Sequence, residues 1–570
     1  MISDTVMSDT VMSEGVMSGT LMSDTVIIDG YVDEPACLGV PPYISPYIRT
    51  VAGVLKTAGK NPAYFTIDQL RKDPFTTAKL RNASLVVMVA GTTVPGKYLA
   101  GTPAALTEIQ QLGASFSSKT TAFLGGPVSF GYSDQGGKKA ETVTSAGWTG
   151  ILEGDPAAAL SSWLSGGEAK GMLSYSDYDT FAKAGADIIQ QHPFYPNVML
   201  ELETAKGCSR SITGGCAFCT EPFYGLPRHR ELSGIFSEVE ALYRAGARHF
   251  RLGRQPDLLT YGVSGAEFPK PDADKLRKLF SGIRNAAPDL KTLHIDNVNP
   301  GTIAHHEDAA RDALCAVIEG HTAGDTAAFG VESADPAVIS ANNLKGTADE
   351  IFRAVEIVNE VGSVRRNGIP ELLPGLNFIA GLAGETPETF TINRAFLQRI
   401  ADAGLLVRRV NIRQLMPFEG TRAYTDNTIG KHDKEFHAFK NEVREKFDVP
   451  MMEKVFPVGT VFDDVLIEVS GAISFGRQMG TYPVLIGIPE KLPAGAVVRA
   501  AVVSYGARSL TALTYPVRIN HLPISALKWL PGISAKAAAK VVSKMPFKNA
   551  DELCRVVPSA KEIAQILDYS

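Results

Sequence analysis

The length and composition of the chain are those of an ordinary globular protein with several domains. Its 570 residues suggest three or four domains at roughly 150 residues each. Hydrophobic residues at 45% and charged residues at 21% exclude wholesale disorder and fibrous structure. A formal net charge of −5 excludes a global basic field, so any contact with nucleic acid or an anionic membrane has to be local.

The N-terminal residues form a short repeat and carry no membrane signal. Residues 2–26 are five imperfect copies of one pentapeptide, a period that matches neither helix nor strand, so residues 1–26 are expected to be a disordered tail. A signal peptide would need a basic start and a continuous apolar run, and neither is present. No apolar run of about 18 residues occurs elsewhere. We therefore expect a cytoplasmic protein without membrane contact.

Residues 27–189 alternate between expected strands and helices, which predicts a parallel, doubly wound, Rossmann-like domain. The expected strands cover residues 26–31, 63–67, 84–90 and 121–124, and the expected helices cover residues 45–58 and 102–112. Such sheets bind ligands beyond the carboxyl ends of their strands. In this chain those ends are residues 33–37, 91–97 and 125–130.

Residues 190–450 show a second series of alternating strands and helices. Six strands are expected at residues 197–203, 249–253, 292–297, 327–332, 375–380 and 407–415, with helices between them. Six such repeats favour a partial or full parallel barrel over an open sheet. Chemistry in barrels is carried by the loops that follow the strands.

The last 120 residues change to short β segments and then to short helices. Runs at residues 460–469, 482–488, 497–504 and 509–514 predict a small all-β barrel over residues 451–518. Residues 519–570 are expected to form short helices around a Leu-Pro-Gly-Ile-Ser turn at 530–534.

Three of the six cysteines gather directly after the first expected strand of the barrel: Cys208, Cys216 and Cys219. Six cysteines are too few for a disulfide framework, so this grouping indicates a metal site in a reducing compartment. With His229 as a fourth ligand the site would be a Cys3His zinc knuckle. Three cysteines alone would hold a [4Fe–4S] cluster with one iron open. The position directly after the first barrel strand favours the cluster, because structural zinc knuckles usually lie in small β-rich modules. Free thiols are the third alternative.

These cysteines, with the aromatic Phe218 directly before the last of them, resemble the radical S-adenosyl-L-methionine (SAM) superfamily. Seven residues separate the first two cysteines, whereas the commonest form of the motif has three. The resemblance implies that the open iron chelates SAM and that an electron from a donor such as ferredoxin or flavodoxin cleaves a C–S bond. The product would be a 5′-deoxyadenosyl radical, which abstracts hydrogen from an unactivated carbon.

The ends of the later strands extend this resemblance. It implies that Gly253, Arg254 and Gln255 contact the methionine end of SAM, although Arg254 and Gln255 stand where Gly and Glu are usual. It also implies that Asn297 and Glu332 contact the ribose or the carboxylate of SAM, and Glu332 stands within a Gly-Val-Glu-Ser strand end. Residues 381–386 are similar to the "G-L-P-G-E-T" element of the superfamily. Glu332 could instead form an ordinary salt bridge at the barrel mouth, and Glu385 could simply favour a helix start.

The flanking segments resemble modules that accompany radical SAM barrels. Residues 27–189 resemble a cobalamin-binding-like domain, but the D-x-H-x-x-G motif is missing and the first histidine is His192, so cobalamin is possible but disfavoured. Cys37 is expected to be a small buried hydrophobe. Residues 451–518 resemble the RNA-binding TRAM barrel, with residues 475–482 as its exposed loop. Residues 519–570 resemble a helix-hairpin-helix, in which Gly532, Lys536 and Lys540 would contact phosphate.

Taken together, the segments resemble a group of radical SAM proteins, mainly archaeal, with a C-terminal helix-hairpin-helix. The leading hypothesis is an enzyme that modifies RNA, probably tRNA. One alternative is a radical SAM enzyme acting on a small molecule or a protein side chain, and another is a nucleic-acid-binding protein with a structural or redox-sensing cluster. Methylthiolation is disfavoured because it would need a second three-cysteine cluster, and residues 1–190 contain only Cys37.

Overall fold

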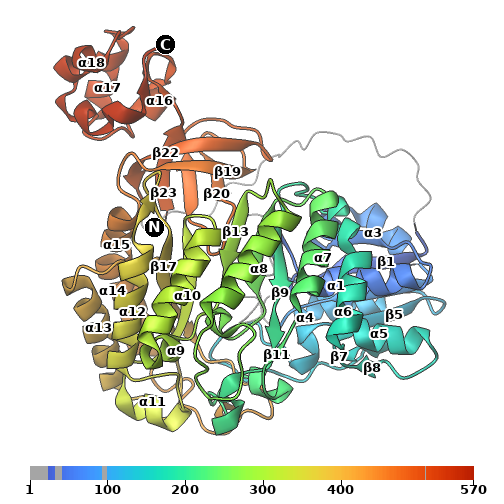
Figure 1. Ribbon diagram of the computed structural model, residues 1–570. Helices are drawn as coiled ribbons and strands as arrows, with labels where there is room; N and C mark the ends of the chain where they lie inside the picture. The colour runs from blue at the N-terminus through green and yellow to red at the C-terminus, as the bar shows by residue number, and fades with distance from the viewer. Residues whose placement is uncertain (1–22, 33–41, 82, 93–98, 100, 507–508) are drawn as a thin grey trace. The chain divides into compact units, whose positions relative to one another are not determined.

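The computed structural model describes residues 23–32, 42–81, 83–92, 99, 101–506 and 509–570 (Figure 1). The pentapeptide repeat up to residue 22 and Cys37 lie outside the described residues. Backbone contacts divide the chain into two compact units. The larger unit comprises residues 23–457 together with 479–482, and the smaller one contains residues 458–478 and 483–570.

The first domain of the larger unit is built on a parallel five-stranded sheet with the order β3-β1-β4-β5-β6. Its strands are β1 (Thr25–Asp29), β3 (Ala63–Thr66), β4 (Leu85–Val89), β5 (Thr121–Gly125) and β6 (Gly150–Ile151). Every residue of β1 and β4 is buried, as expected for strands covered by helices on both faces. The described helices are α1 (Pro46–Thr57), α2 (Ile67–Lys72), α3 (Pro74–Leu80), α4 (Leu106–Ala114), α5 (Pro156–Leu164) and α6 (Tyr175–Ala184). The expected Rossmann-like architecture is confirmed.

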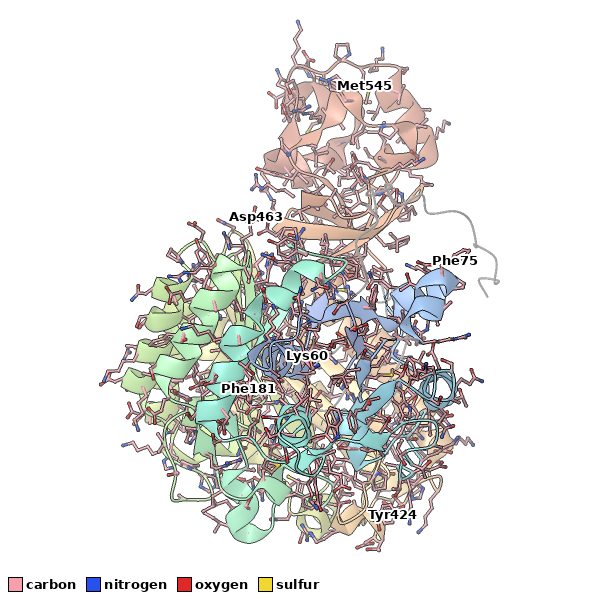
Figure 2. All side chains as sticks on the ribbon, turned by 90° about the vertical axis from the view of Figure 1, so that its right-hand side faces the viewer. Lys60, Phe75, Phe181, Tyr424, Asp463 and Met545 are labelled. Carbon is pink, nitrogen blue, oxygen red and sulfur yellow. The ribbon has the colours of Figure 1, made fainter. Side chains whose placement is uncertain are left out.

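Helices α1 and α6 pack unusually closely at a glycine. Phe181, labelled in Figure 2, lies on α6. A side chain at Gly53 of α1 would place its Cβ 1.9 Å from the carbonyl oxygen of Phe181, so only glycine fits at this crossing. One turn earlier in α1, the guanidinium of Arg49 pairs with Glu238 at 2.9 Å. Arg230 pairs with the other carboxylate oxygen of Glu238 at 2.6 Å. All three side chains are buried, so these ion pairs join the first domain to the barrel.

The second domain is an open, parallel half-barrel, so the expected partial barrel is confirmed. One sheet has the order β13-β12-β9-β2 and the next has the order β14-β17-β18, and an isolated bridge between Asn297 and Ala328 connects them. The strands are β2 (Tyr43–Ile44), β9 (Met199–Glu203), β12 (His249–Gly253), β13 (Thr292–Ile295), β14 (Asp325–Glu332), β17 (Leu372–Ala380) and β18 (Arg409–Gln414). Helices cover the outside of these strands (Figure 1): α7 (Leu232–Arg244), α8 (Ala273–Ala286), α9 (Pro300–His305), α10 (Glu307–Gly320), α11 (Pro336–Asn342), α12 (Ala348–Gly362), α13 (Pro387–Asp402), α14 (Asp433–Val443) and α15 (Val449–Val455).

The inner face of the first three barrel strands is charged rather than apolar. Glu201 of β9, Arg251 of β12 and His294 of β13 are register neighbours, and all three are buried. Arg251 pairs with Glu201 at 3.1 Å and also with Asp296, which follows β13. The alternate residues, such as Phe250 of β12, are buried as well. Because successive side chains of a strand point to opposite faces, the charges share one face and the apolar side chains share the other.

The smaller unit contains the expected β barrel, a closed barrel with the strand order β19-β20-β21-β23-β22. Its strands are β19 (Val461–Val469), β20 (Ser474–Gln478), β21 (Leu485–Ile488), β22 (Val497–Tyr505) and β23 (Ser509–Thr514). Three short helices follow: α16 (Ile524–Leu527), α17 (Ala535–Val542) and α18 (Ala550–Val556). Residues of β22, β23 and these helices form one hydrophobic core. Among all described residues, no helix is long and apolar enough to span a membrane.

The expectation of an exposed loop at residues 475–482 is wrong. Residues up to Gln478 belong to strand β20, and Met479 and Thr481 are buried with exposed fractions of 4% and 2%. The segment Met479–Tyr482 groups with the barrel unit, although the strands on either side of it belong to the smaller unit. Thr481 N donates to His294 Nδ1 at 2.9 Å, and Thr292 Oγ1 donates to the carbonyl oxygen of Met479 at 3.3 Å. Polar groups at the amino-terminal end of β13 therefore draw this segment inward.

Candidate functional site

The three cysteines lie on a loop that leaves and re-enters the barrel through a two-stranded neck. Strand β10 (Ala205–Lys206) pairs antiparallel with β11 (Arg228–His229), and the loop between them starts directly beyond β9. The loop turns through glycines with positive φ at Gly207, Gly214 and Gly215. The carboxyl oxygen of Glu221 accepts a bond of 2.8 Å from Gly207 N, which fixes the start of the loop. The cysteine loop is thus a defined structure at the carboxyl end of the first barrel strand.

Side chains from the far side of the barrel hold the cysteine loop in place. The guanidinium of Arg210 donates to the carbonyl oxygen of Asn343 at 2.7 Å and to its Oδ1 at 3.0 Å. Asn343 has a φ of +49°, and its amide nitrogen donates back to the carbonyl oxygen of Gly215 at 3.0 Å. The guanidinium of Arg422 reaches the same oxygen at 3.0 Å. Loops after β14 and β18 therefore clamp the loop after β9.

An apolar cluster lies beneath the middle of the cysteine loop. Its buried members come from the loop itself and from the segments after β14, β17 and β18: Ala217, Val338, Leu344, Leu382, Leu415 and Ala423. Phe218 packs against this cluster and is only partly exposed. The structure thus gives Phe218 a packing role beside Cys219, and its expected role in cofactor binding stays a prediction.

The three thiols are electrostatically linked, with Cys216 buried and Cys208 and Cys219 partly exposed. Burial raises the pKa of Cys208 to about 11, and it also raises the pKa values of Cys216 and Cys219. The charge of Cys216 further raises the pKa values of Cys208 and Cys219, and that of Cys208 raises the pKa of Cys219. Two cations oppose these effects: Arg210 donates to Cys216 Sγ at 3.2 Å, and Lys345 lowers the pKa values of Cys208 and Cys216.

The donor set is three cysteines, which is the set that a [4Fe–4S] cubane with one open iron uses. Over the described residues, no three His, Cys, Asp or Glu side chains are placed as the ligands of a single ion. In a cubane each cysteine binds a different iron, so three thiolates can be spread around the group and leave the fourth iron open. His229, the fourth ligand of the zinc alternative, instead has its Nε2 2.9 Å from the carbonyl oxygen of Val263. The residues present therefore fit a [4Fe–4S] cluster.

Two residues expected to contact SAM, Gly253 and Arg254, lie against charged side chains of the barrel strands. A Cβ at Gly253 would lie 1.7 Å from Glu201 Oε1, so glycine is needed here because the Glu201 carboxylate fills the space. Arg254 is buried with a φ of +58°; its Nε lies 3.8 Å from Glu203 Oε2 and its guanidinium lies 5.1 Å from the ring centre of Tyr47. The structure thus explains both residues by packing and charge, and their contacts to SAM stay predictions.

Gln255 and Asn297 are hydrogen-bonded to each other. Asn297 Nδ2 donates to the carbonyl oxygen of Gln255 at 3.2 Å, and the backbone of Asn297 bridges β13 to β14 through Ala328. The side chain of Gln255 is buried and its Nε2 donates to the carbonyl oxygen of Leu252 at 3.1 Å. Its Oε1 has no hydrogen-bond partner among the described residues. A buried acceptor without a donor is costly, so a ligand that donates to this oxygen would stabilise the site.

Glu332 lies at the end of β14 opposite a lysine that the sequence reasoning missed. Burial raises the pKa of the Glu332 carboxyl to about 7, and the charge of Lys345 opposes that rise. A Cβ at Gly330 would lie 2.4 Å from Glu332 Oε1 and 2.8 Å from Lys345 Nζ, so both charged groups border the same small space. Glu332 also has a φ of +61°, which is a strained backbone conformation for this residue. Its Oε2 lacks a hydrogen-bond partner within the described part of the chain.

The segment Asn342–Lys345 was the main omission from the sequence-based site. It supplies a carbonyl oxygen to Ala217 N at 2.9 Å, the Asn343 clamp on Arg210, and the Lys345 ammonium near the thiols. It begins at the last residue of helix α11 and lies outside the strand ends on which the resemblance rests. A signal was nonetheless present, because Asn-Asn-Leu-Lys-Gly combines a left-handed turn with a cation.

A buried carboxyl group lies at the carboxyl end of β1, on the edge of the first sheet where a ligand could bind. Asp29, the last residue of β1, accepts bonds from Tyr64 Oη at 2.8 Å and from Tyr31 N at 2.9 Å. Burial raises the pKa of Asp29 to about 7. Residues 33–41, which follow this strand, lie outside the described residues, so the role of this face in cobalamin binding is untested.

The candidate phosphate-binding residues lie in the smaller unit as expected from the sequence. Gly532 has a φ of +69°, and a Cβ there would lie 2.2 Å from Ser559 Oγ, so glycine is needed for this turn. Ser534 caps helix α17 through a bond of 3.2 Å from Ala537 N. Lys536 and Lys540 are both exposed on this helix. Their contact with nucleic acid stays a prediction.

Comparison with known proteins finds two full-length relatives from archaea. A protein of Archaeoglobus fulgidus is 40% identical over 530 residues, which cover 92% of this chain and 96% of the relative. The protein MJ0274 of Methanocaldococcus jannaschii is 43% identical over 506 residues, covering 85% and 92% of the two chains. Both are described as uncharacterized proteins. The ribosomal protein uS12 methylthiotransferase RimO of Elusimicrobium minutum is 25% identical over 202 residues, or 34% of this chain and 40% of its own.

Among solved structures, the methyltransferase TsrM from Kitasatospora setae, described as a radical S-adenosylmethionine enzyme with cobalamin and a [4Fe–4S] cluster bound, is similar in part. Its TM-score is 0.47 at 14% identity, with 71% of this chain and 74% of that chain covered. The cobalamin-dependent radical enzyme OxsB has a TM-score of 0.44 at 12% identity, with 74% and 56% covered. That enzyme is described with aqua-cobalamin bound. No family model matches the chain.

The open parallel half-barrel, with three thiols on the loop after its first full strand, has the architecture of the radical SAM class. The chain belongs to the same family as the Archaeoglobus fulgidus protein and MJ0274, with which it shares 40% and 43% identity over most of its length.

Proposed function

We propose that the protein is a radical SAM enzyme that modifies RNA, with tRNA as the first candidate, and that Cys208, Cys216 and Cys219 hold its [4Fe–4S] cluster. The observation that carries the proposal is the cysteine loop itself. It presents three thiols, of which Cys216 is buried and the others partly exposed, and an adjacent cation at the carboxyl end of a parallel half-barrel. When bound, the cluster and SAM would supply the reductive C–S cleavage that generates a hydrogen-abstracting radical.

The chain's own residues would bind and orient the cofactor. Gln255 Oε1 and Glu332 Oε2 are buried acceptors that lack a donor among the described residues, and amino or hydroxyl groups of SAM would satisfy them. Lys345 lies beside Glu332 and near the thiols, where its charge would stabilise thiolates or a carboxylate. The apolar cluster beneath Phe218 would keep water away from the buried side of the cysteine loop.

The first experiment tests SAM cleavage by the full chain. After anaerobic reconstitution and reduction with dithionite, the protein should release 5′-deoxyadenosine slowly even without substrate, and Cys216→Ala should release none. Release of methylthioadenosine alone, or of nothing from a protein with an intact cluster, would show that the mechanism is wrong. Gln255→Ala should weaken SAM binding while the cluster remains, whereas Gln398→Ala, on the exposed side of α13, should not. Unchanged affinity in Gln255→Ala would remove Gln255 from the site.

The proposal of RNA as substrate rests on the smaller unit. A closed five-stranded barrel and a glycine turn before a lysine-bearing helix are features that contact phosphates in nucleic-acid-binding modules. Residues 521–570 hold seven Lys or Arg against four Asp or Glu, a local balance of +3 inside a chain of net charge −5. This balance is opposite in sign to that of the whole chain, so an anionic partner would be attracted locally.

A salt titration of tRNA binding to the full chain tests this part of the proposal. Affinity should fall steeply with salt, by a slope of roughly −0.7 to −0.9 per phosphate contact. Lys536→Glu and Lys540→Glu should lower affinity about equally for all sequences, since neither lysine is expected to read a base. Lys278→Glu, on the exposed face of α8, is the matched control. Absence of salt-sensitive binding at micromolar concentration would favour a small-molecule or protein substrate instead.

Cobalamin is the second cofactor to test, at the carboxyl ends of β1, β4 and β5. The parallel sheet places these ends on one edge, where ligands of doubly wound domains bind. Hydroxocobalamin should remain with the full chain through gel filtration and show its visible spectrum if this edge binds it. Loss of the corrinoid under the same conditions would indicate that the domain does not bind cobalamin and has a structural role only.

A further inference from the structure

We infer that Arg409 and Arg413 on the inner face of β18 form a binding site for an anionic group of the substrate. The inference rests on the proposed function, because it assigns these residues to the substrate of the same enzyme. It goes beyond that proposal by naming a barrel residue pair and a ligand chemistry, phosphate or carboxylate, that the cysteine loop does not require.

Strand geometry places both arginines inside the barrel. Arg409, Asn411 and Arg413 alternate with Val410 and Ile412 along β18, so the three polar side chains share one face of the sheet. A Cβ at Gly375 of β17 would lie 2.7 Å from Thr326 Cγ2 and 3.3 Å from Arg409 Cγ. Side chains of β14 and β18 therefore meet across the glycine on that face.

The inner face opens toward the carboxyl end of the strand. Arg409 and Asn411 are partly exposed, and Arg413 is exposed, whereas Ile412 on the outer face is buried with an exposed fraction of 8%. On the neighbouring strand β17, Asn377 and Ile379 are likewise partly exposed. Solvent therefore reaches the inner face near the end of the barrel where the cysteine loop also lies.

Neither arginine forms a direct ion pair with a described residue. No ion pair or side-chain hydrogen bond of Arg409 or Arg413 occurs within the described part of the chain, whereas the buried Arg49, Arg230 and Arg251 are all paired. The charges of Asp296 and Asp448 act on Arg409, and that of Arg413 acts on Glu332, without direct contact. Asp296 is itself bound by Arg251 and Tyr482, so the N–H donors of the two arginines have no bound acceptor among the residues that the structure describes. An anionic ligand would supply those acceptors.

A neighbouring aromatic ring orients the guanidinium of Arg409. Its guanidinium lies 4.3 Å from the ring centre of Tyr482, a contact that orients the planar group and leaves its N–H donors available. Asn411 Nδ2 donates to Asn377 Oδ1 at 3.2 Å, so the amides beside the arginines are also fixed. Two arginines next to ordered amides are suited to the oxygen atoms of a phosphate or a carboxylate.

The test measures anion binding to the full, cluster-loaded chain with pyrophosphate and tricarballylate as probes. Because the exposed lysines of α17 could also bind anions, all titrations are made in a Lys536→Glu, Lys540→Glu background. Pyrophosphate should bind, and Arg409→Gln or Arg413→Gln should each weaken it at least about tenfold. Arg399→Gln, on the outer helix α13 and paired with Asp349, should change the affinity less than about twofold. A preference for pyrophosphate indicates a phosphate-bearing substrate, and a preference for tricarballylate indicates a carboxylate.

Two results would overturn the inference. The first is unchanged anion affinity in Arg413→Gln, which is exposed and therefore separates binding from folding even if Arg409→Gln is unstable. The second is a loss of SAM affinity in either variant, because the arginines would then hold the SAM carboxylate and not the substrate. Neither measurement needs turnover, so failure of anion binding is distinguishable from failure of SAM cleavage.

Discussion

The phenol of Tyr482 donates a hydrogen bond of 2.7 Å to the carboxylate of Asp296, although 186 residues separate them in the sequence. The same carboxylate pairs with Arg251, which pairs in turn with Glu201, and Glu201 accepts a bond from Tyr43 Oη. This buried polar chain crosses the barrel from the Met479–Tyr482 segment to strand β2. Tyr482 has a φ of +52°, which is unusual for a bulky residue and is maintained only because its surroundings fix it.

Removing the hydroxyl of Tyr482 should destabilise the barrel unit. Tyr482→Phe keeps the ring beside Arg409 but leaves the buried Asp296 carboxylate without one donor, a loss of about 1.5–3 kcal/mol. The change is measured as a lower denaturation midpoint and as faster hydrogen exchange in β13. Tyr243→Phe removes an exposed hydroxyl that bonds Asp289 at 2.8 Å and should have a much smaller effect. Equal effects of the two substitutions would contradict the role of Tyr482.

Iron binding should depend on three of the cysteines and not on the others. Alanine at Cys208, Cys216 or Cys219 should abolish the iron–sulfur absorption, while Cys315→Ala and Cys554→Ala should retain about four iron and four sulfide per chain. Cys315 is exposed and Cys554 packs against the core of the smaller unit. Iron and sulfide analysis after anaerobic reconstitution checks this. Stoichiometric zinc with negligible iron would show that the cluster assignment is wrong.

The side-chain amide of Asn343 should control how long the cluster is retained. Asn343→Gly tolerates the positive φ of this position but removes the bonds to Arg210 and Gly215, so the cysteine loop should loosen. Iron should be lost to a chelator several times faster than from the unsubstituted protein. Asn367→Gly is the matched control, because Asn367 also has a positive φ of 53° and lies in an exposed turn. Identical rates of iron loss would remove Asn343 from the clamp.

The buried carboxyl of Asp29 should make the first domain less stable as the pH rises. Its pKa is about 7 in the folded state against 3.8 ordinarily, so between these values the folded state binds more protons than the unfolded state. Stability therefore falls through this window, by up to about 4 kcal/mol above pH 7.

Asp29→Asn tests this titration directly. The asparagine retains partners for Tyr31 N and Tyr64 Oη but cannot ionise. It should raise the unfolding temperature of the first domain at pH 8 and leave it nearly unchanged at pH 4.5. Glu168→Gln, an exposed substitution, should show no such difference between the two pH values. A variant that is less stable than the parent at pH 8 would contradict the raised pKa.

Much of the architecture could be predicted from the sequence because its strands are strongly marked. The run at residues 84–90 became β4, and residues 249–253 became β12 with the expected bounds. The first run is apolar, the second alternates polar and apolar side chains, and each ends at a turn. The cysteines were also identifiable, because three thiols within twelve residues are rare. Local composition was enough in these cases, as the relevant interactions lie close together in the chain.

The parts that escaped prediction depend on contacts between distant residues. Nothing local in Asn343 or Lys345 reveals that they meet a loop more than 120 residues earlier in the chain. The segment containing Tyr482 is polar and glycine-rich, which is typical of a surface loop, yet its partners His294 and Asp296 draw it inward. At Gly253 the sequence did not reveal that the Glu201 side chain excludes a larger residue, and the expected contact of Gly253 with SAM stays a prediction.

The insertion of residues 479–482 into the barrel has a consequence for how the protein is made and how it can be divided. During synthesis the ribosome completes all six long barrel strands by residue 414, yet the groups that bond His294 and Asp296 emerge only with Thr481 and Tyr482. Nearly 70 further residues must therefore be synthesised before these buried polar groups of the half-barrel have their hydrogen-bond partners. A gene that ended after residue 457 would encode Cys208, Cys216 and Cys219 and all six long strands of the parallel half-barrel, but it would leave those buried groups without their partners.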